Sequence, residues 1–184
     1  MIPLRFVLLC GLLTALLAPA RAEERPPADF AGLGFLVGRW EGRSEVELAP
    51  GAYVPARHRW RFERALSNRD GAFLMGESDL GGKTGISHHE HLIIGYERPG
   101  RLMIWRFLEG GVFARAELKR QGEKDEWIAL FPPPAGNPGK IHDYRQVIRR
   151  EGAAAWSLRE QTRQTAEGAW HDAFRGRYAR VQER

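Results

Sequence analysis

Short segments with a two-residue period of polarity run from Phe35 to the C-terminus, and they constrain the fold more than any other feature. In Arg57–Glu63 the odd positions are all charged, while the even positions carry His58, Trp60 and Phe62. A β-strand places alternate side chains on opposite faces, so this segment has one solvated face and one packed face. A helix would scatter the same residues around its circumference. The alternation therefore predicts a strand.

Ten such segments are separated by turn sequences that recur about every 8 to 15 residues. The turn Asp70-Gly71 is typical of a hairpin because both residues tolerate positive φ. This spacing, without a long amphipathic helix, indicates an all-β sandwich or barrel. The predicted strands are Phe35–Leu48, Arg57–Ser67, Ala72–Leu80, Ile86–Glu97, Arg101–Leu108, Val112–Arg120, Glu126–Phe131, Ile141–Arg150, Ala154–Thr165 and Ala169–Val181.

Short connections between successive strands favour an antiparallel up-and-down meander, and closing it into a barrel removes both exposed sheet edges. The segment from Asp29 to Leu36 predicts a short helical turn that covers one end, with Asp29 as its N-cap. Trp40 is expected to fill the floor of the barrel. A barrel of about ten strands is too wide for its own side chains to fill, so it has room for a small ligand.

The first 22 residues have the layout of a secretory signal peptide. An almost unbroken apolar run of 13 residues ends before Pro19, and Ala20-Arg21-Ala22 is a small-x-small cleavage site. The run is shorter than the roughly 20 residues of a membrane-spanning helix; an uncleaved anchor is the alternative. We therefore expect a signal peptide over 1–22, a flexible lead-in over 23–33 and one barrel domain over 34–182. The mature chain would be periplasmic or secreted, without stable membrane insertion.

Composition excludes several classes of function. The single cysteine, Cys10, lies in the predicted signal peptide, so the mature chain would have no disulfide, zinc-thiolate cluster or cysteine nucleophile. The formal net charge of +5 would fall by two on loss of Arg5 and Arg21. The remaining arginines are spread out and interleaved with glutamates, which favours solvated strand faces over a phosphate-recognition site. A nucleic-acid partner is not expected.

The segment Phe35-Leu36-Val37-Gly38-Arg39-Trp40-Glu41-Gly42 resembles the first strand of calycin-like, lipocalin-like bacterial β-barrel domains of unassigned function. It is more distantly similar to nitrobindin-type haem-binding barrels. Ile93–Glu97 and Gly168–Val181 are similar to later strands of these domains. The resemblance implies a calycin-like barrel. It also implies haem as a candidate cofactor, held by a histidine on a late strand.

His171 is the only histidine in the last predicted strand. Alternation groups Trp170, Phe174 and Tyr178 on the inner face of that strand and places His171 on the opposite face. The residue that the haem resemblance would use is therefore expected to point outward.

Several polar residues share strand faces with aromatic side chains and are candidates for the lumen. His58 lies on the face of Trp60, and His142 on the face of Tyr144. Glu160 would need a partner if it were buried; an arginine–glutamate pair would orient an acidic ligand or form a structural network. Its candidate partners are Arg64, Arg106 and Arg115, with Glu117 as an alternative acid. The predicted ligand-binding set is Trp40, His58, Trp60, Phe62, Trp105, His142, Tyr144, Trp156 and Glu160.

The densest histidine cluster is Ser87-His88-His89-Glu90-His91. On a strand, His89 and His91 share one face with their Cβ atoms about 7 Å apart or less, which allows both to bind one metal ion. Glu77 and His58 are candidates for a third ligand. A solvated strand edge with chance histidines is the alternative interpretation.

No nucleophile elbow, phosphate-binding loop or zinc-protease motif occurs in the sequence. The expected function is therefore an exported β-barrel that binds a small, largely apolar molecule. One alternative is an enzyme that uses the lumen through haem, a metal or His/Glu acid–base groups. The other is a structural or interaction module whose barrel is filled by its own side chains.

Overall fold

The computed structural model describes residues 30–67, 71–82, 85, 87–122, 125–132 and 141–182. The predicted signal peptide, lead-in residues 23–29 and the Asp29 cap lie outside these ranges. Within them, no helix is long and apolar enough to cross a bilayer. The elements in chain order are η2 (Phe30–Leu36), β1 (Gly38–Ala49), β2 (Ala52–Ser67), β3 (Gly71–Gly81), β4 (Ser87–Arg98), β5 (Arg101–Leu108), β6 (Val112–Arg120), β7 (Glu126–Phe131), β8 (Asp143–Arg150), β9 (Ala155–Arg163) and β10 (His171–Arg180).

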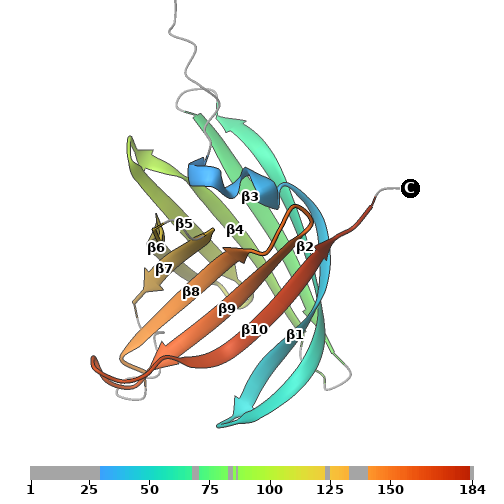
Figure 1. Cartoon of the computed structure of the whole chain (residues 1–184), viewed down its shortest axis with the longest axis vertical. Coiled ribbons are helices and arrows are strands. Elements are labelled where there is room, and N and C mark those ends of the chain that lie inside the picture. The colour runs from blue at the N-terminus through green and yellow to red at the C-terminus, as the bar shows by residue number, and fades with distance from the viewer. Residues whose placement is uncertain are drawn as a thin grey trace, which may run out of the picture.

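The ten antiparallel strands form one closed barrel, which confirms the predicted all-β up-and-down fold (Figure 1). Each strand pairs with the next along the chain, and β10 pairs with β1 to complete the ring. In that last pairing Trp40 lies opposite Arg180, and Val46 lies opposite Phe174. Closure gives both end strands of the meander a full set of backbone partners, which an open sheet would lack.

The first two strands begin at different residues from those predicted. Phe35 is still part of η2, and β1 starts at Gly38. Gly38 has a φ of +125°, a conformation that favours glycine, and it turns the chain from the helix into the strand. β2 begins at Ala52 rather than Arg57 because the ladder between β1 and β2 continues to the pair Ala49 and Ala52.

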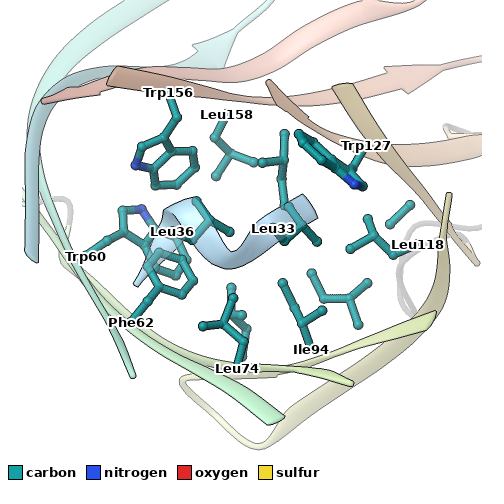
Figure 2. Packing of buried hydrophobic residues seen from close by; sticks show 14 of the residues in the cluster. Leu33, Leu36, Trp60, Phe62, Leu74, Ile94, Leu118, Trp127, Trp156 and Leu158 are labelled. Atoms are coloured by element: carbon teal, nitrogen blue, oxygen red, sulfur yellow. The ribbon is translucent and has the colours of Figure 1, made fainter. Parts of the chain in front are cut away.

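The 3₁₀ helix η2 lies across one end of the barrel (Figure 1). Leu33 and Leu36 from η2 are fully buried in the middle of a ring of apolar side chains (Figure 2). Trp40 is 1% exposed and donates its indole N–H to the carbonyl oxygen of Leu36 at 2.6 Å, in agreement with its expected place at the barrel floor. We call the half of the barrel next to η2 the packed end. Its ring includes Trp60, Phe62, Leu74, Ile94, Leu118, Trp127, Trp156 and Leu158.

A bulge in β10 changes the expected side-chain pattern of the last strand. Phe174 and Tyr178 are buried as predicted, but the register with β9 shifts between Asp172 and Phe174. Trp170 precedes the strand and packs outside the barrel against Arg145 and Arg163, whose guanidinium carbons lie 4.1 Å and 4.8 Å from its ring centre. The prediction that Trp170 faces inward is wrong because strict alternation ends at the bulge.

Candidate functional site

The end of the barrel opposite η2 contains a cavity of about 770 Å³. Its polar lining includes His58, Glu90, Arg106, Tyr144 and Glu160. A groove of about 700 Å³ also runs over the outside of the barrel, but charged side chains form most of its border. Small-molecule sites combine apolar walls with a few convergent polar groups, so the inner cavity is the candidate site. Its apolar walls include Val46, Leu80, Leu108, Val112, Phe113, Ala114, Phe131, Leu158 and Phe174.

A buried arginine lies at the centre of the polar lining. Arg106 on β5 binds Glu90 on β4 through two hydrogen bonds, one of them 2.9 Å from Nη2 to Oε2. Nη2 also lies 2.9 Å from Oε1 of Glu160 on β9. The side chains of Arg106 and Glu90 are only 5% and 4% exposed, whereas Glu160 keeps 21%. Glu160 is therefore the carboxylate that is most accessible to a molecule in the cavity.

Two residues of β8 complete this network. Arg106 donates a hydrogen bond from Nη1 to the hydroxyl oxygen of Tyr144, and Gln146 donates from Nε2 to Oε1 of Glu160 at 2.9 Å. Burial raises the pKa of Tyr144 well above its ordinary value, so its hydroxyl stays protonated. The network joins β4 and β5 to β8 and β9 across the lumen.

The charges and hydrogen bonds of the network keep the carboxylate of Glu160 ionised. Burial by itself raises the pKa of Glu160, but the charge of Arg106 and the hydrogen bonds from Gln146, Tyr144 and Arg106 outweigh it and lower the pKa below the ordinary value. Glu90 and Glu160 carry two negative charges against the single positive charge of Arg106. The polar part of the cavity is thus net negative.

His58 on β2 is the second polar feature of the cavity. Its Nδ1 lies 2.7 Å from the hydroxyl of Tyr178. Burial lowers the pKa of His58 to about 4, so the imidazole is neutral at pH 7. Its Nε2 is buried and has no hydrogen-bond partner among the described residues. In either neutral tautomer, that nitrogen is therefore a buried polar atom whose hydrogen-bonding position the fold leaves unsatisfied.

The structure divides the predicted ligand-binding residues into three groups. His58, Tyr144 and Glu160 line the cavity. Trp105 lies on the outer face of β5, because alternation puts its neighbours Ile104 and Arg106 inside. The side chain of His142 is 51% exposed and lies 3.1 Å from Asp143, outside the cavity lining. The remaining four lie at the packed end, where aromatic rings fill the lumen: Trp40, Trp60, Phe62 and Trp156.

The pairing of Glu160 with Arg106 confirms one of the partners that the sequence offered for this carboxylate. Glu90 was not among the predicted ligand-binding residues. It shares the inner face of β4 with Leu92 and Ile94, which are buried. The two-residue period could therefore have identified Glu90, although the histidines on either side of it, His89 and His91, point to a metal site instead.

The residue that the haem resemblance implies does not fit that role. The side chain of His171 is 52% exposed, and its Nε2 lies 2.7 Å from Oε1 of Glu47. His171 does not line the cavity. His171 is therefore not placed to hold haem in the lumen.

The two predicted metal-binding histidines lie away from the cavity. His89 and His91 are on the outer face of β4, beside Glu77 on β3. The alternative third ligand, His58, is inside the barrel. Of the two candidates for a third metal ligand, the fold therefore places Glu77 next to these histidines.

Comparisons with known proteins support the fold alone. No protein-family model matches this chain, and no curated protein matches it. Among solved structures, the crystal structure of Rv2717c from M. tuberculosis is similar, with a TM-score of 0.59 and 16% sequence identity. The match covers 84% of this chain and 98% of that chain. A similarity at this identity shows a shared barrel architecture and does not transfer a ligand or an activity.

Proposed function

We propose that this protein is an exported, calycin-like barrel that binds a small, largely apolar molecule in its lumen. The observation that carries the proposal is the cavity of about 770 Å³, whose mostly apolar walls surround a buried polar network. Cavities of this size are typical of sites for small organic ligands. Export rests on the signal-peptide layout of residues 1–22.

The network selects against acidic ligands. The nitrogen atoms of Arg106 already bind Glu90, Tyr144 and Glu160. A ligand carboxylate would compete with two protein carboxylates and would add a third negative charge to a poorly solvated site. A neutral molecule, or one with a positively charged group directed at Glu160, is the better match.

His58 offers a ligand a neutral ring beside the apolar walls. Its Nε2 has no partner among the described residues but is itself buried, so it is not the atom that meets a molecule in the cavity. Its Nδ1 meets the hydroxyl of Tyr178 rather than a carboxylate. This arrangement favours binding of a ligand over acid–base catalysis by His58.

Two fluorescent probes of similar shape and different charge test the proposal. We expect neutral N-phenyl-1-naphthylamine to bind with one-to-one stoichiometry, and anionic 8-anilino-1-naphthalenesulfonate to bind at least about tenfold more weakly, a difference of roughly 1.4 kcal/mol. The variant Ala114→Trp places a large ring in the cavity wall and should abolish binding of the neutral probe. Ala179→Trp puts the same ring on the exposed outer face of β10 and should leave binding unchanged.

Circular dichroism and thermal unfolding would establish that both tryptophan variants keep the barrel. Equal probe binding by both folded variants would locate the probe outside the lumen and overturn the proposal. Native mass spectrometry of the protein from the periplasmic fraction tests export at the same time. Recovery of the protein from the cytoplasmic fraction alone, with residues 1–22 still attached, would contradict export.

A further inference from the structure

Three potential metal ligands meet on the outer wall of the barrel. Glu77 on β3 lies directly opposite His91 on β4, and His89 is two residues from His91 on the same face. The Nε2 atom of His89 is 3.0 Å from Nε2 of His91 and 3.6 Å from Oε1 of Glu77. One ligand atom from each of the three residues lies within 4.8 Å of the other two.

Two of these separations are close to those of a tetrahedral coordination sphere. Zinc binds imidazole nitrogen and carboxylate oxygen at about 2.0–2.2 Å, which places neighbouring ligand atoms of a tetrahedron roughly 3.3 Å apart. The two distances from Nε2 of His89 lie on either side of that value. An ion could therefore occupy the centre of the cluster with small side-chain rotations and without movement of the strands.

Asp79 provides the support that metal-binding histidines usually have. It lies directly opposite His89, and its Oδ1 is 2.9 Å from Nδ1 of His89. A metal-binding histidine commonly donates its second ring N–H to a carboxylate, which fixes the tautomer and the ring orientation. With Nδ1–H donated to Asp79, the lone pair of Nε2 is directed toward His91 and Glu77.

We propose that Glu77, His89 and His91 form a zinc site with Asp79 as the residue that orients His89. Two imidazoles and a carboxylate, without thiolate, suit Zn²⁺ or Cu²⁺ rather than Cu⁺. The side chains of His89 and Glu77 are 40% and 49% exposed, so the fourth position is open to water and the ion can exchange. The site lies outside the lumen and does not depend on the proposed ligand.

Calorimetric titration of Zn²⁺ into tag-free full-length protein at pH 7.5 tests the site. We expect one ion per chain, and His89→Ala and His91→Ala should each weaken binding by more than about 100-fold. Asp79→Asn should weaken it by about 10- to 100-fold, as the loss of an orienting partner does. The matched control is His142→Ala, because His142 is also exposed and beside a carboxylate, Asp143, but has no second histidine in contact among the described residues.

Two further readouts separate a metal site from a hydrogen-bonded pair of histidines. Cu²⁺ should displace Zn²⁺, and Mg²⁺ should not, because of the affinity order for nitrogen ligands. Zinc affinity that is unchanged in the folded double variant His89→Ala/His91→Ala would overturn the proposal and leave only a hydrogen bond between the histidines.

Discussion

At the scale of single residues, His58 shows how burial controls protonation in this barrel. It is 4% exposed, and its ring packs against Trp60, Phe174 and Tyr178. The aromatic contacts exclude water, and the only hydrogen-bonding partners of Nδ1 that the structure shows are hydroxyl groups. The charged form of the imidazole is therefore disfavoured in the folded state.

This burial predicts a loss of stability in mild acid. The unfolded chain protonates His58 near pH 6.5, whereas the folded chain does so only near a pKa of about 4. Between these values the unfolded state binds the extra proton, so the free energy of unfolding falls as pH decreases from 6.5 to 4. At about 1.4 kcal/mol per pKa unit, His58 contributes a loss of up to about 3 kcal/mol.

Urea unfolding of wild type and His58→Gln from pH 4 to 7 measures this contribution. The variant should show a flatter dependence of the free energy of unfolding on pH. The matched variant His142→Gln changes an exposed histidine beside Asp143 and should alter the slope less than His58→Gln does. Parallel curves for wild type and His58→Gln would show that His58 is not responsible for the acid sensitivity.

At the scale of elements, the contact between β1 and β10 depends on a residue without a side chain. A Cβ atom at Gly42 would lie 2.0 Å from the backbone oxygen of Arg177 and 2.7 Å from Cδ1 of Tyr178. These two strands close the barrel, and Tyr178 fills the lumen beside Trp156. The glycine therefore permits the close approach that barrel closure requires.

We expect Gly42→Ala to lower the free energy of unfolding by about 1–3 kcal/mol, because the added methyl group displaces backbone atoms of β10. Gly81→Ala is the matched control at the end of β3, where an added Cβ has no atom within 4 Å; it should change stability by less than about 0.5 kcal/mol. Denaturant unfolding of both variants is the measurement. Equal stability of the two would contradict the role of Gly42 in closure.

At the scale of the whole molecule, the lumen is divided into a packed end and a cavity. Aromatic and aliphatic side chains beneath η2 fill one half (Figure 2). The network of Arg106, Glu90 and Glu160 stands in the other half and connects opposite parts of the wall. The charged groups are stable there only as a set, since each buried charge depends on its partners.

Removal of the central charge should therefore destabilise the barrel strongly. Arg106→Met leaves the buried carboxylate of Glu90 and the partly buried carboxylate of Glu160 without their guanidinium, and we expect a loss of about 3–5 kcal/mol in the free energy of unfolding. Arg57→Met breaks the exposed pair with Glu41, whose side chains are 68% and 43% exposed, and should cost less than about 1 kcal/mol. Chemical denaturation at pH 7 compares the two variants. Similar losses would show that the network contributes no more to the free energy of unfolding than an exposed ion pair does.

Much of the candidate site follows from local pattern, and the remainder does not. Alternation along β2 and β9 put His58 and Glu160 on inner faces, as the structure shows. The same rule predicted that Trp60 and Trp156 contact the ligand, yet both are buried in the core of the packed end. Periodicity reports which face of a strand a residue occupies, but not how far along the barrel axis the lumen is filled.

Local pattern alone predicted the number of strands, their meander order, a short helical turn before them and most inward-facing positions, because these depend on neighbours close along the chain. The three-dimensional structure was needed to show that Leu33 and Leu36 of η2 are buried inside that end, that Arg106 meets both Glu90 and Glu160, and that Glu77 rather than His58 lies beside His91. The partners across β3, β4 and β5 depend on the register of each hairpin, and the closed barrel brings the distant strands β5 and β9 close enough for Arg106 to reach Glu160. The meeting of their side chains depends on register, twist and bulges, which no local period encodes.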